Sequence, residues 1–429
     1  MAGRRILSID ILRGLGIMVI VVIHRIHYHW TGMRNPEVLK EQFSGPWGPV
    51  IVFTIALFTM AGIFYFISGL VNAHSMYSRV MSGRSTARKA MLGGMFGGAW
   101  ILLMNYVHRI FFMNGFLVSE PGADSRFPVG LLTGLVRDPS AAGFRWTQVT
   151  DPGTLALIGM VVMAVSLVLG TMLQKRSYFT KPKIYLVLIL LGAAALLLSP
   201  LSKFYLRPVY ETLMENRSYF TAACVGAVCQ EFGLVPYLGY GFIGAVIGIG
   251  IASGESTIQI FRRGRIIAIL LFLTGAIPLL VFNRHDHFGR GCIGTGICMI
   301  ELAFFIIIQL WLYKYLDLAT DEKYAVRQQR TTGMRRFGML ALTVYIFEPF
   351  VAEVFMQLAN IFFGAGWNNQ LPYVLLFGLF LLIFWYFALK VWEKYRFAGS
   401  LEWLTGIIML KMAGKRSGKT NFKSLGSSS

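Results

Sequence analysis

The first apolar segment of the chain contains three polar side chains whose types and spacing suit chemistry, namely Asp10, Arg13 and His24. In an α-helix, Arg13 and His24 lie about three turns apart, so they share one face and are separated by roughly 16 Å along the axis. Asp10 lies about one turn before Arg13 and can neutralise its charge. A guanidinium binds anionic groups, and an imidazole with a pKa of about 6.5 can act as a general base. This face is a candidate site; the structural alternative is an interfacial ion pair with a histidine bonded to a carbonyl.

Three further polar residues, His27, Tyr28 and His29, lie shortly after His24. His24 and His27 are three residues apart, so their imidazoles can face the same vestibule. No carboxylate or cysteine stands near them at ligand spacing, and His108 is the one clear histidine partner in another apolar segment. We therefore expect neither a metal ion nor haem.

Later apolar segments also contain ionisable residues, which cost free energy in a bilayer and so indicate functional sites. His108 and Arg109 are candidates for anchoring an anionic or sugar ligand, or else they reach the interface with their polar ends. Glu301 and Glu348 are either paired structural groups or acid–base groups. We retain His108, Arg109 and Glu348 as candidate substrate-binding residues.

The composition indicates an integral membrane protein. Of the 429 residues, 55% are hydrophobic and 14% are charged, whereas soluble proteins have roughly 25% charged residues. The 40 Lys and Arg residues against 20 Asp and Glu give a net charge of +20. These basic residues lie between apolar runs and form no stripe interleaved with exposed aromatic residues, so we expect a lipid bilayer and an anionic ligand as partners and no nucleic acid.

The apolar runs set the expected architecture. A hydrocarbon layer of about 30 Å needs about 20 apolar residues per crossing. We expect an all-α integral membrane protein with about ten transmembrane helices, in one transmembrane domain over residues 1–410 with a basic disordered tail over 411–429. The runs are 8–27, 49–73, 91–116, 153–173, 184–200, 234–253, 265–282, 292–316, 337–360 and 371–393.

The distribution of Lys and Arg predicts the orientation. Basic residues concentrate in the two ends of the chain and in every second connecting segment, while the alternate segments contain far fewer. Because cytoplasmic loops carry the excess of Lys and Arg, both termini are predicted to be cytoplasmic.

Two formal motif matches and the cysteines carry little information. Residues 413–420 match a phosphate-binding loop, and residues 239–244 match a dinucleotide fingerprint, but neither follows a predicted strand. The G-x-x-x-G spacing of Gly244 and Gly248 instead predicts close helix packing.

Four cysteines are too few for a disulfide framework, so both possibilities stay open, one or two disulfides or free thiols. They are Cys224, Cys229, Cys292 and Cys298.

The residues Arg5–Gly14, with Arg13 and then His24, resemble the opening of membrane acyltransferases of the acyltransferase type 3 family. They also resemble the related heparan-α-glucosaminide N-acetyltransferase family with its bacterial relatives. The type 3 family has Arg or Lys, ten residues, and then His, which Arg13 and His24 match. Short resemblances spread over nearly the whole chain, at residues 64–69, 153–159, 338–345 and 399–403.

The resemblance implies transfer of an acyl group, expected to be acetyl, from cytoplasmic acyl-CoA to an extracytoplasmic acceptor. The expected acceptor is a sugar hydroxyl or amine of a glycan, and the expected location is a prokaryotic inner membrane. The oligomeric state stays open, a homo-oligomer included. In this hypothesis Arg13, Asp10 and Ser68 bind acyl-CoA, and His24 is the general base. Tyr28, His108, Arg109 and Glu348 would bind the acceptor.

Departures from the two families leave alternatives. The lysosomal enzymes place Asn where His24 stands and use a histidine of the following loop, so His27 and His29 are alternative catalytic residues. The type 3 family has a histidine near the position of Glu348. A rival hypothesis is a transporter or exporter of an anionic solute that uses Arg13 and Arg109 as ligands. Transporters often contain inverted repeats, and the sequence shows none.

Overall fold

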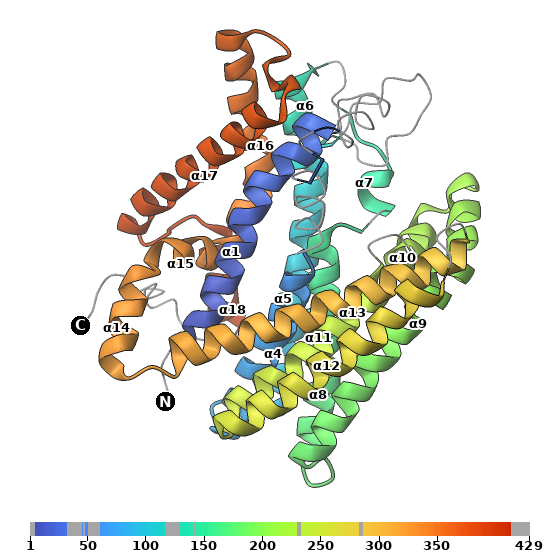
Figure 1. Cartoon of the computed structure of the whole chain (residues 1–429), viewed down its shortest axis with the longest axis vertical. Coiled ribbons are helices and arrows are strands. Elements are labelled where there is room, and N and C mark those ends of the chain that lie inside the picture. The colour runs from blue at the N-terminus through green and yellow to red at the C-terminus, as the bar shows by residue number, and fades with distance from the viewer. Residues whose placement is uncertain are drawn as a thin grey trace. The chain divides into compact units, whose positions relative to one another are not determined.

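A computed structural model describes residues 5–31, 45, 48–49, 61–115, 129–139, 143–150, 152–229, 233–282 and 286–412. Within these residues the regular elements are helices, and no strand is present (Figure 1). The phosphate-loop match at residues 413–420 and most of the predicted tail lie outside the described residues.

Nine helices among the described residues are long and apolar enough to cross a membrane, and each coincides with one of the ten predicted runs. The remaining predicted run, 49–73, lies partly outside the described residues, and its described part begins the helix α4. The prediction of an all-α, multi-pass membrane protein with about ten helices is confirmed, whereas the cytoplasmic placement of the termini stays a prediction. The nine helices are Leu7–Trp30, Ala87–Phe112, Gln148–Gln174, Lys181–Glu215, Leu234–Ala252, Thr257–Val281, Phe288–Asp317, Ala341–Phe363 and Leu371–Lys394.

Three predicted boundaries are wrong by eight residues or more. The second run was expected to end at residue 73, but α4 ends at Met81, and the seventh was expected to begin at residue 265, but α12 begins at Thr257. The largest error is in the fifth run. The fifth run was expected to end at residue 200, but helix α9 continues to Glu215 and has 35 residues. It contains Pro200 and Pro208. A proline removes one backbone hydrogen bond and strains the preceding turn, but the residues after each proline here continue the helix. Residues 219–229 then form the short apolar helix α10.

The chain divides into two compact units. Unit 1 comprises Met1–Met60, Tyr106–Val149 and Leu318–Ser429, and unit 2 comprises Ala61–Asn105 and Thr150–Asp317. Each unit is therefore built from segments that are distant in the sequence. The prediction of a single domain over residues 1–410 stays a prediction.

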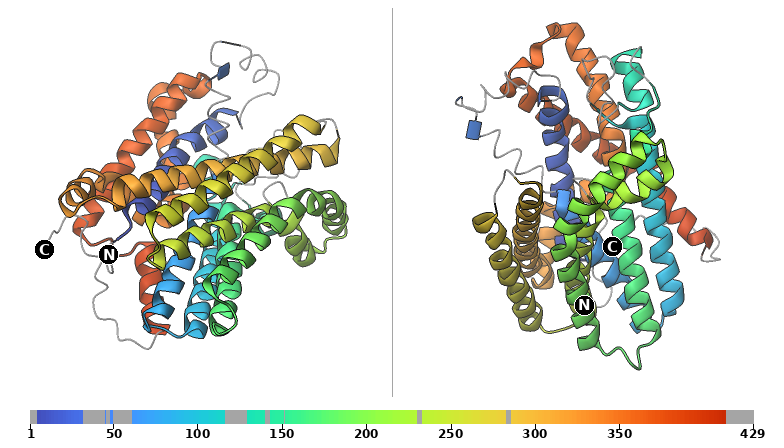
Figure 2. Two further views of the ribbon diagram at one scale, coloured as in Figure 1. Left: turned by 60° about the horizontal axis from the view of Figure 1, so that its bottom comes forward. Right: turned by 90° about the vertical axis from the view of Figure 1, so that its right-hand side faces the viewer.

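Unit 2 is a bundle in which α11 packs against α4, α8 and α9, while α12 and α13 run side by side (Figure 2). A Cβ atom at Gly244 or Gly248 of α11 would overlap with the backbone of α4. The predicted close packing at these two glycines is confirmed. The helices are α4 (Gly62–Met81), α5 (Ala87–Val107, in this unit to Asn105), α8 (Thr154–Gln174), α9 (Lys181–Glu215), α10 (Tyr219–Cys229), α11 (Leu234–Ala252), α12 (Thr257–Val281), α13 (His287–Leu312) and the π-helix η5 (Tyr313–Asp317).

Unit 1 places α1 beside α15, α16 and α17 (Figure 1). Gly14 of α1 and Gly338 of α15 lie where the two backbones meet, since a Cβ atom on either would overlap with the other helix. The helices are α1 (Leu7–His24), the π-helices η1 (Arg25–Thr31) and η3 (His108–Phe112), α6 (Leu131–Arg137), α7 (Thr147–Thr150), α14 (Asp321–Arg330), α15 (Thr332–Met339), α16 (Ala341–Phe363), the 3₁₀-helix η6 (Trp367–Asn369), α17 (Leu371–Lys394) and α18 (Leu401–Met412).

The start of α16 is held by the carboxylate of Glu402 from α18. Its Oε1 atom accepts hydrogen bonds from the backbone N–H of Leu342 at 2.7 Å and of Thr343 at 3.2 Å. Its Oε2 atom accepts from the Thr343 hydroxyl. The first N–H groups of a helix have no partner within the helix and favour a negative charge. Glu402 therefore fixes the position of the first turn of α16.

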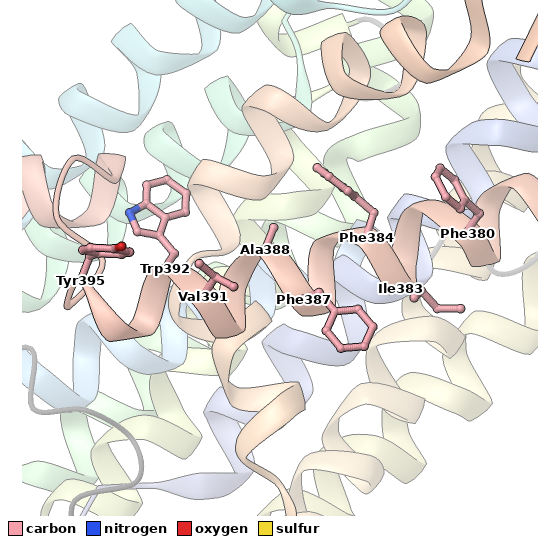
Figure 3. A pocket seen from close by; sticks show the side chains of 8 residues that line it. All are labelled: Phe380, Ile383, Phe384, Phe387, Ala388, Val391, Trp392 and Tyr395. Carbon is pink, nitrogen blue, oxygen red and sulfur yellow. The ribbon is translucent and has the colours of Figure 1, made fainter. Parts of the chain in front are cut away.

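Apolar side chains cover the outer faces of several helices, as contact with lipid requires. On α12, Ile269, Leu270, Leu273 and Leu280 are exposed. A groove along α17 has almost entirely apolar walls, and Figure 3 shows its side chains following one length of the helix. The groove suits hydrocarbon chains and offers no carboxylate or imidazole. It is lined by Phe380, Ile383, Phe384, Phe387, Ala388, Val391, Trp392 and Tyr395.

We expect Glu402→Ala to lower the free energy of unfolding by about 1–3 kcal/mol, because two backbone donors at the start of α16 lose their acceptor. The midpoint of thermal unfolding of the protein in detergent measures this effect. Glu211→Ala is the matched control, because Glu211 is exposed and pairs with Arg207 one turn away; such surface pairs contribute little. Equal midpoints for the two variants would contradict the role of Glu402.

Candidate functional site

The first helix changes its geometry at the residues of interest. The α-helix α1 ends at His24, and the chain continues as the π-helix η1 over Arg25–Thr31. A π-helix has a wider turn and occurs often at functional sites. Ile26 and Trp30 of η1 pack in one buried cluster with Leu371 and Val374 of α17. This cluster holds η1 in place and leaves its polar residues directed elsewhere.

The carboxylate of Glu348, on α16, joins the end of α1 to the start of η1. Its Oε2 atom lies 3.1 Å from Nδ1 of His24. Its Oε1 atom accepts a hydrogen bond from Nη2 of Arg25. Glu348 and Arg25 are completely buried, with at most 1% of either side chain exposed. The ion pair with Arg25 therefore compensates a carboxylate that also contacts an imidazole.

A second buried ion pair continues this network. Glu353, five residues after Glu348 on α16, accepts two hydrogen bonds from Arg137 of α6, with distances of 3.0 Å to Nε and 2.6 Å to Nη2. Gln357 donates to the other oxygen of Glu353 at 2.8 Å. His29 connects the two pairs, because its Nδ1 atom is 3.0 Å from Nη1 of Arg25 and its Nε2 atom is 3.5 Å from Glu353. The two carboxylates and two guanidinium groups balance in charge.

The partners assign the proton positions on the two imidazoles. A guanidinium only donates hydrogen bonds, so Nδ1 of His29 is an acceptor and its proton resides on Nε2, facing Glu353. A carboxylate only accepts, so His24 carries its proton on Nδ1, facing Glu348. The neutral form of His24 then has Nε2 as its proton-accepting atom. This is the arrangement of a histidine general base that is oriented by a carboxylate.

The three histidines of the first segment therefore differ in their surroundings. His29 is buried, and both of its ring nitrogens lie against charged partners. His27 is half-buried, with its ring 4.9 Å from that of Tyr28. His24 contacts the carboxylate of Glu348 through Nδ1 and is 8% exposed, against 2% for His29. Of the three alternatives left open by the sequence, His24 has the surroundings that suit a base.

Aromatic rings surround His24. The ring centroid of Tyr28 is 5.3 Å from that of His24, and the centroid of Tyr345 is 6.3 Å away. The ring of His108 lies 5.2 Å from Tyr345, and its Nδ1 atom is 3.3 Å from the carbonyl oxygen of Ile346. The predicted residues His24 and His108 thus both lie against the ring of Tyr345 on α16, which was not among the predicted site residues.

Arg109 and Ser68 are not among the residues that surround His24. Arg109 is buried, and its Nε atom donates to the carbonyl oxygen of Gln148 at 2.9 Å, which holds the backbone of α7. Ser68 belongs to α4 in unit 2, whereas the other candidates belong to unit 1. The predicted binding roles of Arg109 and Ser68 stay predictions.

The opposite end of α1 contains a cluster of arginines. Asp10 is 4.0 Å from Arg13, as predicted from their spacing, and it also accepts a hydrogen bond from Nη2 of Arg5 at 3.1 Å. Arg335 of α15 approaches the same carboxylate at 3.9 Å and is 1% exposed. Three guanidinium groups around one carboxylate form a cationic cluster, which Glu402 near Arg13 and Glu393 near Arg335 offset in part. Such a cluster suits an anionic ligand.

The comparison with models of known protein families and with curated proteins finds no match to this chain. The fold and the site define a multi-pass α-helical membrane protein whose first helix links an arginine cluster at one end to a buried histidine–carboxylate pair at the other.

The four cysteines are free thiols. The prediction that no metal ion or haem is bound stays a prediction.

Several residues of the network were missed by reasoning from the sequence. Arg25 lies within the first predicted run but was not considered as a candidate, Glu353 was passed over, and Arg137 lies between two predicted runs. The available signal was the presence of two carboxylates, Glu348 and Glu353, in a single apolar run. Two buried negative charges require compensating cations.

We expect Glu348→Gln to destabilise the protein by about 3–5 kcal/mol, because Arg25 then carries an uncompensated buried charge. Thermal unfolding in detergent measures the effect. The double variant Arg25→Met/Glu348→Gln, which removes both charges, should regain part of the lost stability. A double variant that is less stable than the sum of the two single changes would contradict the ion pair.

Proposed function

We propose that this protein is a membrane-embedded acyltransferase that moves an acyl group, expected to be acetyl, from cytoplasmic acyl-CoA to an extracytoplasmic acceptor. The expected acceptor is a sugar hydroxyl or amine. The observation that carries the proposal is the contact between Nδ1 of His24 and the buried carboxylate of Glu348. A histidine oriented in this way removes a proton from a hydroxyl or amine as that group attacks a carbonyl carbon.

With His24 as the base, the transfer takes up one proton and returns one proton. The acceptor oxygen or nitrogen attacks the thioester carbonyl and releases its proton to Nε2 of His24. The carbon–sulfur bond then breaks, and the imidazolium returns this proton to the departing thiolate. Glu348 stabilises the imidazolium, and Arg25 keeps Glu348 ionised. Tyr28, whose ring is close to His24, is the candidate donor to the developing oxyanion. An acyl group carried on His24 itself is the alternative route.

The cytoplasmic end of the proposed path is the cluster of Arg5, Arg13 and Arg335 around Asp10. The nucleotide end of CoA is strongly anionic, and guanidinium groups bind phosphate through paired hydrogen bonds. Arg13 and His24 lie on one regular helix, with roughly 16 Å between them along its axis. The slim pantetheine arm can extend over such a distance, so that only the acyl group passes on to the acceptor.

The alternative of an anion transporter has weaker support. Of its two proposed ligands, Arg109 already donates to the carbonyl oxygen of Gln148, and Arg13 serves the acyltransferase proposal equally well. The orientation with both termini in the cytoplasm and the location in a prokaryotic inner membrane belong to the acyltransferase proposal. Binding of acetyl-CoA distinguishes the two functions, since the transporter hypothesis does not require it.

We expect His24→Ala to reduce acyl transfer by at least about 10²–10⁴-fold, which is the usual contribution of a general base. The acetyl content of surface glycans, measured by mass spectrometry in cells with and without the gene, gives the activity. Acetyl-CoA should still raise the unfolding temperature of the purified variant, which shows that the fold and the donor site persist. Acetylation at the wild-type level would remove His24 from the mechanism.

We expect Arg13→Ala to weaken acetyl-CoA binding by about tenfold or more, since a hydrogen bond to a charged group contributes about 1.5–3 kcal/mol. Titration of the protein in detergent with acetyl-CoA measures this affinity. The control is Arg207→Ala, which removes an exposed arginine paired with Glu211. An affinity equal to that of the control would show that Arg13 is structural.

A further inference from the structure

Unit 2 contains a carboxyl group that the proposed chemistry does not use. Glu301 lies on α13, inside a segment that is long and apolar enough to cross a membrane. Its Oε2 atom is 2.6 Å from the hydroxyl oxygen of Tyr240 on α11. The carboxyl group also lies against α4, because a Cβ atom at Gly62 would come within 2.8 Å of the same oxygen. Three helices therefore enclose Glu301.

Among the described residues, Glu301 has no compensating cation. It forms no ion pair with Lys, Arg or His there, and its Oε1 atom is buried without a hydrogen-bond partner. Glu348 and Glu353, by contrast, each contact an arginine. A carboxylate buried without a cation would lose its hydration and have only the Tyr240 hydroxyl as a hydrogen-bond partner, which costs far more free energy than burying the neutral acid.

The hydrogen-bond geometry indicates where a proton resides. The Tyr240 hydroxyl lies between two oxygen atoms, Oε2 of Glu301 at 2.6 Å and the backbone carbonyl of Cys298 at 2.7 Å. A tyrosine hydroxyl has one proton to donate, and a carbonyl oxygen only accepts. Both short contacts are satisfied when Tyr240 donates to Cys298 and Glu301 donates to Tyr240. That arrangement requires a protonated Glu301.

We propose that Glu301 and Tyr240 form a proton-binding site within the helix bundle of unit 2, in which Glu301 is a neutral carboxylic acid at neutral pH. The bound ligand is the proton between Oε2 of Glu301 and the oxygen of Tyr240. Its loss would leave one hydroxyl proton for two acceptors and would weaken the contact between α11 and α13. This inference does not depend on the acyltransferase proposal.

The other titratable groups near Glu301 are two phenols, a thiol and a lysine. Tyr237 of α11 stacks on Tyr65 of α4, with ring centroids 4.0 Å apart, and its ring is 5.6 Å from Tyr240. Cys298 is one turn before Glu301 on α13 and is a free thiol. Lys203 of α9 lies on the Cys298 side of the site, and the ion pairs of the described residues include none between Lys203 and Glu301. Phenols and the Cys298 thiol thus lie closer to Glu301 than any ion-pair partner among the described residues, which favours the neutral acid.

Infrared difference spectroscopy tests the proposal. The spectrum of the full-length protein minus that of Glu301→Gln, both in a detergent without ester groups at neutral pH, should contain the carbonyl stretch of a protonated carboxylic acid. This band should shift in D₂O. Glu353→Gln is the control and should show only carboxylate bands, because Glu353 is paired with Arg137. A Glu301→Gln difference spectrum with only carboxylate bands would overturn the proposal.

A second measurement needs no variant. A hydrophobic carbodiimide adds to a protonated carboxyl group in apolar surroundings and rearranges to a stable N-acylurea, which peptide mass spectrometry locates. We expect Glu301 to be labelled in the wild-type protein at neutral pH, and Glu348 and Glu353 to stay unlabelled. Labelling of Glu301 should decline as the pH is raised. An unlabelled Glu301 would overturn the proposal.

Discussion

The buried ion pair between Arg25 and Glu348 is the interaction on which the rest of the candidate site depends. Glu348 can remain ionised inside an apolar helix bundle only because Arg25 compensates its charge. An ionised Glu348 in turn fixes the proton of His24 on Nδ1, so that Nε2 is the atom able to accept a proton. The same arginine donates to His29 and thereby fixes the opposite tautomer there. One guanidinium thus determines the chemical state of two imidazoles.

The surrounding helices hold this pair in register. The π-helical turn of η1 brings His29 within reach of Arg25, and α16 carries Glu348 at a position set by the Glu402 carboxylate at its first turn. Contact between the backbones of α1 and α15 at Gly14 leaves no space in which α1 could slide. These constraints come from residues that take no part in the proposed chemistry. Their common effect is to keep an imidazole and a carboxylate at hydrogen-bonding distance within an apolar environment.

The sequence predicts some of these features and not others, for physical reasons. Hydrophobic length is a local property, so the membrane-crossing helices and the Asp10–Arg13 pair could be predicted, and so could the candidacy of His24. Charge compensation between distant segments is not local. Nothing in the spacing of residues relates Arg25 to Glu348, which are 323 positions apart. The end of α9 was missed because the continuous apolar run stops near residue 200, whereas the helix continues through more polar residues to Glu215.

The tautomer of His24 tests the central claim most directly. Nitrogen NMR of the protein labelled with ¹⁵N-histidine, compared with the same sample of His24→Gln, identifies the His24 signals and the nitrogen that carries the proton. Free neutral histidine prefers the proton on Nε2. The account predicts the opposite for His24, with the proton on Nδ1 and an unprotonated Nε2. A His24 signal showing the proton on Nε2 would mean that Glu348 does not orient this ring, and it would contradict the proposed mechanism.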